Sequence, residues 1–390
     1  MNGLFDYLLF VVNPQTISAS LFQSVQRRCK RQLSETEKVQ EPPEHEIRVA
    51  VAGVGSSVSG MLQAAELYKR GSGTGLLHGV LGPFSPSDIS LVAAFDVDER
   101  KVGRPVREAL QAVPGALPMF TPIKQNLKVE PGLSKNELAS DSPATKAVSY
   151  DSFVSSLEKA RPDVLLNAIT GGLDSTGEAY AQAALDCGCA FVNATPTPIA
   201  TSTELEAKFR HRGLPLLGDD LLSQIGGTLF HSMVLSVLSS RGVKITQTYQ
   251  LDVGGGRENE VTVEDDELRL RKRAIKTLTV ASVIPYKIKA ATGTTEYVDF
   301  MGNSRDSRFE IMGETVLGAP IEVEVTLRSV DGANAAGPLL DAVRVAKLCL
   351  LKRIGGAIED VNPYLFKLVR SPVDPVSAER MFNDFIKRVS

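Results

Sequence analysis

The first half of the chain alternates short apolar runs with amphipathic segments of helical period. The apolar runs, which predict strands, are residues 47–52, 91–96, 164–169, 190–193 and 214–218. The amphipathic segments, which predict helices, are residues 61–69, 178–187 and 203–211. Strands that alternate with helices along a chain usually form a parallel sheet with helices on both faces. We therefore predict an α/β domain built on a doubly wound parallel sheet.

The pattern changes after a long predicted helix at residues 223–241. Residues 244–253 and 321–330 alternate apolar and polar side chains with period two, which predicts strands of an antiparallel sheet. Long helices are predicted again at residues 336–354 and 376–389. The predicted divisions are an N-terminal extension with a helix and a charged linker at 1–45, the α/β domain at 46–243, an inserted α+β domain at 244–335, and C-terminal helices that return to the α/β domain at 336–390.

A glycine-rich turn follows the first predicted strand. The residues of this turn that could surround a dinucleotide pyrophosphate are Gly53, Gly55, Ser56 and Ser57. A strand, a glycine turn and a helix N-terminus together let backbone N–H groups approach a phosphate closely. Val58 occupies the place of the third glycine in the G-x-G-x-x-G pattern, so the turn also fits an ordinary connection between a strand and a helix.

Asp96 ends the second predicted strand, where a carboxylate can accept hydrogen bonds from both hydroxyl groups of an adenosine ribose. An acidic residue there favours NAD over NADP, because it would repel a 2′-phosphate. The alternative is that Asp96 only caps the next turn. Thr170 and Asn193 follow two further strands at the same edge of the predicted sheet, and ligands of parallel sheets bind at that edge. These positions together predict a Rossmann-like nucleotide crevice.

Residues 267–277 (ELRLRKRAIKT) follow an acidic cluster and predict a basic helix, because carboxylates favour the N-terminal end of the helix dipole. Lys272 and Lys276 are four residues apart and so share one face of this helix. Like charges at that spacing repel each other. The cluster therefore indicates either a solvated face, which is the usual explanation of a charge run, or a bound anion among the cations.

Composition narrows the function. A chain of 390 residues can form two domains, and its net charge of −3 gives no basic surface for nucleic acid. The apolar run at residues 8–12 is too short to span a membrane and has no basic residues ahead of it, so we predict neither a membrane span nor a secretory signal. The cysteines lack metal-ligand spacing, which predicts reduced thiols in a cytoplasmic protein without a metal site.

Several longer motifs resemble those of the myo-inositol-phosphate synthase family, also called inositol-3-phosphate synthases, in its prokaryotic form. These motifs are GLLHGVLGPFSPSDISLVAAFDVDERKVG (75–103), FVNATP (191–196), LPLLGDDLLSQIGGT (214–228), RKRAIKT (271–277), DGANAAGPLLDAVR (331–344) and PYLFK (363–367). The resemblance implies a Rossmann-like domain with an inserted catalytic and tetramerisation domain, bound NAD, and a sugar-phosphate substrate. It also implies conversion of glucose 6-phosphate to inositol phosphate, for inositol and phospholipid biosynthesis, by a homotetramer.

The resemblance also implies which residues form the site. Matched to the family motifs, the catalytic positions are Lys272, Lys276, Lys367 and Arg305. The cofactor-binding positions are Gly53, Gly55, Ser56, Ser57, Asp96, Thr170, Asn193 and Asp219. The substrate-binding positions are Ser304, Asp331 and Asn334, although a plain turn also explains residues 331–334. Lysines there could neutralise charge on oxygen during enolisation and aldol cyclisation, and could exchange protons when buried.

Three positions depart from the family pattern. Arg305 replaces a lysine, and arginine binds phosphate well but cannot act as an acid or base near neutral pH. Leu222 stands where the family has a lysine, and Gly256 where it has an asparagine. These departures keep two other functions open: a NAD-dependent enzyme that acts on a different sugar phosphate, and a non-catalytic NAD-binding oligomer.

Overall fold

The structure is a computed structural model that describes residues 46–135 and 146–390. The predicted N-terminal helix and charged linker at residues 1–45 lie outside the described residues. Within the described part, no helix combines the length and the apolar character that crossing a membrane requires.

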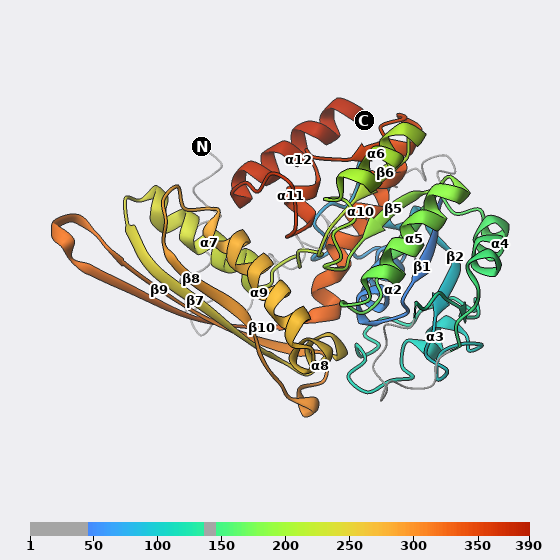
Figure 1. The fold of residues 1–390 in the computed structure, drawn as a ribbon, viewed down its shortest axis with the longest axis horizontal. Coiled ribbons are helices and arrows are strands. Elements are labelled where there is room, and N and C mark those ends of the chain that lie inside the picture. The colour runs from blue at the N-terminus through green and yellow to red at the C-terminus, as the bar shows by residue number, and fades with distance from the viewer. Residues whose placement is uncertain (1–45, 136–145) are drawn as a thin grey trace, which may run out of the picture. The chain divides into compact units, whose positions relative to one another are not determined.

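The larger sheet has seven strands, all of them parallel (Figure 1). In spatial order they are β11 (Gly356–Ala357), β6 (Pro215–Leu217), β5 (Ala190–Asn193), β4 (Val164–Asn167), β1 (Ile47–Ala52), β2 (Ile89–Asp96) and β3 (Glu130–Pro131). The chain runs outward from β1 in both directions, so the strand order reverses between β1 and β4. This confirms the predicted doubly wound α/β fold, and the reversal is the point at which such sheets bind ligands.

Helices cover both faces of this sheet. They are α2 (Ser56–Lys69), α3 (Val106–Ala109), α4 (Tyr150–Ala160), α5 (Asp174–Cys187), α6 (Thr203–Arg212), α10 (Asp331–Leu351), α11 (Asn362–Leu365) and α12 (Pro375–Val389), with a 3₁₀ turn at η3 (Pro86–Asp88). The side chains of β1 alternate between two buried cores, as the period of a strand requires. Val49 and Val51 pack with α2 and α10, whereas Ala50 and Ala52 pack with α4 and α5.

The smaller sheet has four strands in the order β10 (Pro320–Val330), β9 (Ser304–Glu314), β7 (Lys244–Gly254) and β8 (Lys289–Tyr297). The prediction of antiparallel strands is confirmed for β7 and β10, each of which pairs antiparallel with β9, whereas β8, which was not predicted, runs parallel to β7. The reason is the connection: α8 (Arg257–Glu264) and α9 (Asp266–Ala281) lie between these strands, and a helical crossover returns the chain in the same direction. Short 3₁₀ turns occur at η4 (Asp299–Met301) and η5 (Val316–Gly318).

Helices α7 (Gly227–Ser240) and α9 pack on one face of the smaller sheet, around a third core that contains Leu235, Val280 and Phe309 (Figure 1). Helix α9 contains the predicted basic segment. Asp265 caps it by accepting a hydrogen bond from the backbone N–H of Leu268 at 2.9 Å. The division of the chain into domains stays a prediction.

A buried ion pair ties α10 to the loop before η3. Arg344 is fully buried, and its Nη2 lies 2.5 Å from Oδ1 of Asp341. The same guanidinium group donates to the backbone carbonyl oxygens of His78 at 2.8 Å and Gly79 at 3.3 Å. Oδ2 of Asp341 lies 2.6 Å from Nδ1 of His78. One charged pair therefore satisfies the carbonyl groups of a loop that has no regular structure of its own.

Candidate active site

A cavity of about 850 Å³ lies where the carboxyl ends of β1, β2 and β4 face the smaller sheet. Residues from both sheets line it. Of the predicted site residues, those that line this cavity are Gly53, Gly55, Ser56, Ser57, Asp96, Thr170, Lys272, Lys276, Arg305, Asp331 and Lys367. Segments far apart in the sequence therefore meet at one place.

The glycine turn at one end of the cavity has the geometry that a dinucleotide needs. Gly53 has a φ of +90°, and a Cβ atom at this position would lie 2.4 Å from the carbonyl oxygen of Ala168. Gly55 is different, because a Cβ atom there would meet no atom within 4 Å. Helix α2 begins directly after Gly55 without a side-chain cap. The open space and the free helix N-terminus fit a pyrophosphate.

Asp96 both caps the turn and faces the cavity. Its Oδ2 accepts a hydrogen bond from the N–H of Val54 at 2.8 Å and one from Nζ of Lys101 at 2.9 Å. Its Oδ1 accepts from the N–H groups of Val97 and Asp98 at 2.8 and 3.0 Å. The carboxylate is therefore oriented by the backbone on both sides while it lines the cavity. The two alternatives for this residue, turn cap and ribose partner, are compatible.

Substituting the two glycines should separate folding from dinucleotide binding. We expect Gly53→Ala to destabilise the protein by roughly 1–3 kcal/mol. Gly53 has a positive φ, and the added methyl group would overlap the backbone of Ala168, which directly follows β4. Gly55→Ala should unfold at the wild-type temperature but bind NADH at least about tenfold more weakly, since its methyl group occupies only cavity space. Thermal unfolding and NADH fluorescence titration measure the two effects. Equal NADH affinity in Gly55→Ala and wild type would exclude this turn as the pyrophosphate site.

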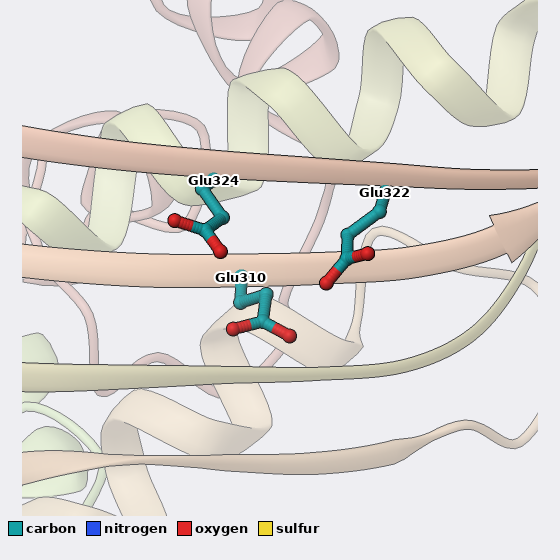
Figure 2. Close-up of side chains that lie close together, drawn as sticks. All are labelled: Glu310, Glu322 and Glu324. Carbon is teal, nitrogen blue, oxygen red and sulfur yellow. The ribbon is translucent and has the colours of Figure 1, made fainter.

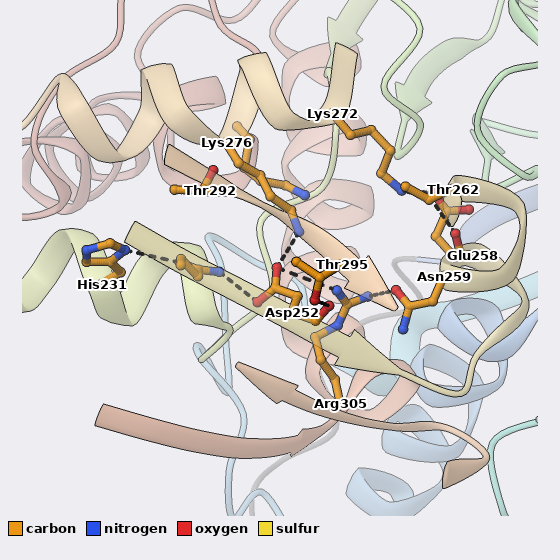
Figure 3. Close-up of polar contacts among 12 residues, drawn as sticks. His231, Asp252, Glu258, Asn259, Thr262, Lys272, Lys276, Thr292, Thr295 and Arg305 are labelled. Carbon is orange, nitrogen blue, oxygen red and sulfur yellow. Dashed lines mark hydrogen bonds and ion pairs between the residues drawn. The ribbon is translucent and has the colours of Figure 1, made fainter. Parts of the chain in front are cut away.

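Two lysines of α9 point into the cavity, and each is paired with a carboxylate (Figure 3). Nζ of Lys276 lies 2.5 Å from Oδ2 of Asp252 on β7. Nζ of Lys272 contacts Glu258 on α8 and donates to Thr262 Oγ1 at 2.9 Å. Both lysines are buried, because Lys276 is only 6% exposed and Lys272 only 7%. The interpretation of this helix face as solvated is therefore wrong.

The charges around Lys276 act in opposite directions. Burial lowers the pKa of Lys276, and the nearby cations Arg305 and Lys367 lower it further, whereas Asp252 raises it. Burial alone would raise the pKa of Asp252, but Lys276 and Arg305 outweigh it and hold that pKa below its ordinary value. Asp252 is therefore a carboxylate at neutral pH, and Lys276 is an ammonium group that burial predisposes to release its proton.

Arg305, on β9, is engaged by protein groups on several sides. Its Nε donates to both carboxylate oxygens of Asp331 at 2.9 Å, and its Nη2 donates to Asn259 Oδ1 at 2.7 Å. Nη1 lies 3.9 Å from Asp252. Although burial opposes it, Asp331 raises the pKa of Arg305, so this guanidinium group stays charged and cannot exchange protons. Its contribution in this cavity is electrostatic.

Lys367 reaches the cavity from the C-terminal part of the chain. Its backbone N–H donates to the carbonyl oxygen of Asp220 at 2.8 Å, and Leu222 pairs likewise with Leu365 at 2.8 Å. This short antiparallel pairing brings Nζ of Lys367 to 2.6 Å from Oδ1 of Asp220. Oδ2 of Asp220 is buried without a hydrogen-bond partner among the described residues. It can therefore accept a hydrogen bond from a ligand hydroxyl group.

The start of α7 offers a second place for an anion. This helix has 14 residues, begins after Gly226 without a side-chain cap, and lines the cavity with Gly227 and Thr228. A free helix N-terminus and nearby lysines favour a phosphate group. Leu222, 8% exposed, also lines the cavity and contributes an apolar surface where a cation was expected from the family pattern. Gly256 lines the cavity as well and begins α8 without a side-chain cap.

Four predicted site residues do not line the cavity. Asn193 and Asp219 are fully buried behind it, where Nδ2 of Asn193 donates to Oδ1 of Asp219 at 2.7 Å. Burial raises the pKa of Asp219 to about 6, against the hydrogen bonds that it accepts from Asn193 and from residues 200–201. The carbonyl oxygen of Ser304 accepts a hydrogen bond from the N–H of Gly255 at 3.2 Å, and Nδ2 of Asn334 donates to the carbonyl oxygen of Ile225 at 3.2 Å. These residues support the wall of the cavity.

The prediction for residues 331–334 is corrected in one respect: they form the first turn of α10 and not a plain turn. The sequence reasoning also missed the carboxylates that pair with the cations, Asp220, Asp252 and Glu258. One signal could have indicated Asp252. Thr248, Gln250 and Asp252 alternate along β7 and so share its buried face, where a packed strand usually carries apolar residues.

Asn303 was missed as well, and it connects the smaller sheet to the glycine turn. Its Nδ2 donates to Oγ of Ser56 at 2.9 Å, and its Oδ1 accepts from the N–H of Gly332 at 2.7 Å. This side chain thus fixes the start of α10, which carries Asp331, against the start of α2. Nothing in the sequence around Asn303 indicates that contact.

A cluster of carboxylates lies on the smaller sheet away from the cavity. Glu310, Glu322 and Glu324 have oxygens within 4.8 Å of one another (Figure 2). Glu310 precedes Ile311 of the third core and so lies on the opposite face of β9. The hydroxyl group of Tyr249 donates to Glu310, and Arg308 pairs with Glu324 at 3.2 Å. These contacts compensate part of the repulsion within the cluster.

Comparison with known proteins gives consistent results. Residues 226–332 match the family model described as myo-inositol-1-phosphate synthase. The chain is 34% identical over 352 residues to an inositol-3-phosphate synthase of Corynebacterium glutamicum, a match that covers 86% of this chain and 97% of that protein. It is 33% identical over 339 residues to an inositol-3-phosphate synthase of Mycolicibacterium smegmatis, with coverage of 83% and 93%.

The fold has close counterparts among solved structures. The crystal structure of a myo-inositol-1-phosphate synthase-related protein from Thermotoga maritima superposes with a TM-score of 0.78, and the match covers 88% of this chain and 99% of that one. Sequence identity in this match is 20%, so it concerns the fold alone.

Proposed function

The chain belongs to the myo-inositol-1-phosphate synthase family, and from this premise we propose that it converts D-glucose 6-phosphate to 1D-myo-inositol 3-phosphate with bound NAD. The observation that carries the proposal is the meeting of Lys272, Lys276 and Lys367 in one cavity with the glycine turn. These lysines come from distant parts of the chain. A fold needs no such convergence of buried and partly buried cations for stability, because burying a charge is costly.

The residues around the cavity suit the successive needs of this conversion. The phosphate group of the substrate would lie at the start of α7, where the uncapped N–H groups of Gly227 and Thr228 are available. The ammonium groups of Lys276 and Lys367 would stabilise negative charge that develops on the substrate oxygens during enolisation and ring closure. Nζ of Lys276 would also exchange a proton with the substrate, since burial lowers its pKa.

The cofactor would be held by this chain's own groups at the other end of the cavity. The start of α2 and the open space at Gly55 would bind the pyrophosphate, and Asp96 the adenosine ribose. When bound, NAD supplies the reversible hydride transfer that makes a substrate proton acidic and later restores the hydroxyl group. Because the hydride returns to the product, the reaction should leave no net NADH.

A product assay tests the proposal. We expect wild-type protein incubated with glucose 6-phosphate and NAD to form inositol phosphate, resolved from the unreacted sugar by chromatography, without accumulation of NADH. Other hexose and pentose phosphates form the comparison arms. Binding of NAD without any product from any arm would support a non-catalytic oligomer, and would contradict the proposal.

A second candidate is the same cavity acting on a different sugar phosphate. The observations that favour it are the apolar Leu222 in the cavity wall and the engagement of Arg305 by Asp331 and Asn259. Both reduce the number of cations available to a ligand. Faster turnover of another sugar phosphate than of glucose 6-phosphate in the product assay would favour this candidate.

We also propose that the protein works in the cytoplasm, in inositol and phospholipid biosynthesis, as a homotetramer. Family membership supports these points. The face of the smaller sheet opposite α7 and α9 supports assembly, because no helix covers it within the described residues (Figure 1). Light scattering measures the mass in solution, and a monomer at micromolar concentration would contradict the tetramer.

A further inference from the structure

A chain of buried polar side chains leads from α7 to Lys276. Nδ1 of His231 lies 3.2 Å from Oε1 of Gln250, and Nε2 of Gln250 donates to Oδ1 of Asp252 at 2.9 Å. Oδ2 of Asp252 lies 2.5 Å from Nζ of Lys276. His231 is fully buried, and Gln250 and Asp252 are each 1% exposed. Figure 3 shows His231, Asp252 and Lys276 along this line.

The directions of these hydrogen bonds follow from Asp252. An ionised carboxylate only accepts hydrogen bonds, so Gln250 must direct its NH₂ group to Asp252 and its carbonyl oxygen to His231. His231 must then carry a proton on Nδ1. Burial lowers the pKa of His231 to about 4, so at neutral pH the ring is neutral and its Nε2 is an acceptor. Oγ1 of Thr248 lies 2.7 Å from this Nε2, but it donates its one hydrogen to the carbonyl oxygen of Glu310.

At the end of this series of side chains that lies away from Lys276, His231 and Thr248 are held by further contacts. The ring of His231 stacks on Phe309 with centroids 4.6 Å apart and an interplanar angle of 11°. Thr248 is also buried and lies 2.6 Å from the carbonyl oxygen of Glu310 on β9. Gln250 therefore has one orientation in which all of its polar contacts are satisfied, and that orientation fixes Asp252.

We propose that His231 and Gln250 are positioning residues that hold the Asp252 carboxylate against the Lys276 ammonium group and so fix the protonation of this lysine during turnover. The proposal rests on the proposed role of Lys276 in proton exchange. Neither the solvated-face nor the phosphate-binding interpretation of α9 requires His231 or Gln250. The burial of both residues and the contacts of Gln250 with His231 and Asp252 point to Asp252 instead.

The position of Asp252 matters because the other charged groups near Lys276 act against its proton. Arg305 on β9, Lys367 after α11 and Lys272 on α9 itself are all cations. Strand β8, which also packs against α9, presents the hydroxyl group of Thr292 to Thr277. Of the other carboxylates that line the cavity, Asp220, Glu258 and Asp331 are paired with Lys367, Lys272 and Arg305 respectively. Asp96, Asp98 and Glu260 are paired with Lys101, Arg100 and Arg257. Asp252 is thus the carboxylate that offsets these cations at Lys276.

Two substitutions of Gln250 test the proposal. Gln250→Leu removes the donor to Asp252, so Asp252 can turn away and Lys276 should lose its proton at lower pH. Gln250→Glu keeps an acceptor for His231. The new carboxyl group donates to Asp252 when it is protonated and adds a negative charge when it is ionised. In neither case should Lys276 lose its proton more easily than in the wild type. The control is Gln247→Leu, because Gln247 lies on the same strand but its side chain is exposed.

The measurement is the pH dependence of acetylation of Lys276 by limiting acetic anhydride, read by mass spectrometry. We expect the midpoint to fall by about half a pH unit or more in Gln250→Leu and to stay at or above the wild-type value in Gln250→Glu. An unchanged midpoint in Gln250→Leu, or an equal fall in both variants, would overturn the proposal. Thermal unfolding identifies any variant that does not fold. Gln250→Glu is nearly isosteric with the wild type, so it should fold.

The second measurement is the pH profile of kcat in the product assay. Its midpoint should shift in the same direction as the midpoint of acetylation. Acetylation does not require turnover, so the two proposals can fail separately. A protein that makes no inositol phosphate but shows the expected acetylation midpoints would reject only the proposed function. A protein that makes inositol phosphate with unchanged midpoints would reject only the positioning role.

Discussion

The Lys276→Met variant is expected to lose about 10³-fold or more of its kcat for inositol phosphate formation, while its affinity for NADH stays within about twofold of wild type. Methionine keeps the approximate length of the side chain but removes the ammonium group that pairs with Asp252. The loss combines proton exchange with charge stabilisation. The proposed cofactor end of the cavity, at Gly55 and Asp96, is formed by other elements. The product assay and NADH fluorescence measure the two quantities.

A second substitution of Lys276 and a control variant show what causes this loss of kcat. Lys276→Arg keeps the positive charge but cannot exchange protons near neutral pH, so an activity as low as that of Lys276→Met would indicate a proton-transfer role. Lys289→Met is the control, because Lys289 is an exposed lysine on β8, and it should retain wild-type activity. Substantial turnover by Lys276→Met would exclude Lys276 from the chemistry.

Arg344→Met is expected to lower the free energy of unfolding by about 3–5 kcal/mol, the largest effect on stability that we predict. The substitution leaves the Asp341 carboxylate buried without its cation. It also removes the donors to the carbonyl oxygens of His78, Gly79 and Phe84, so the loop before η3 loses its attachment to α10. Urea unfolding followed by circular dichroism measures the loss.

A double substitution distinguishes the unpaired charge from the lost loop contacts. Asp341→Leu combined with Arg344→Met should be more stable than Arg344→Met alone, because replacing both members of a buried pair leaves no uncompensated charge. Lys208→Met is the surface control. Its pair with Glu204 is exposed at both side chains, 46% and 78%, so its loss should leave the free energy of unfolding close to the wild-type value. Equal effects of Lys208→Met and Arg344→Met would contradict this account.

Local pattern was enough to predict the parallel sheet and the position of the glycine turn. Strand β1 and the turn at Gly53 follow from an apolar run and from the need for a positive φ, and both act over a few residues. Strand β8 was not predicted, although its direction follows from the connection that precedes it. Two helices separate β7 from β8, and such a connection favours a parallel pair.

The lysines of the cavity were predicted, but their partners were not. Lys276 and Asp252 lie on different elements, and so do Lys367 and Asp220. No periodicity in a single element encodes such a pairing, because it depends on how the two sheets pack. The same holds for His231, because it belongs to an apolar helix and its contact with Gln250 joins two different elements. Long-range packing decided the electrostatics of the site.

The pairing of Lys367 with Asp220 also bears on how the chain matures during translation. The glycine turn and the wall at Asp220 leave the ribosome well before residues 365–368, which complete that wall, and before β11 adds the last strand of the parallel sheet. A nascent chain that has not reached these residues therefore leaves the cavity open on one side and Asp220 without its cation.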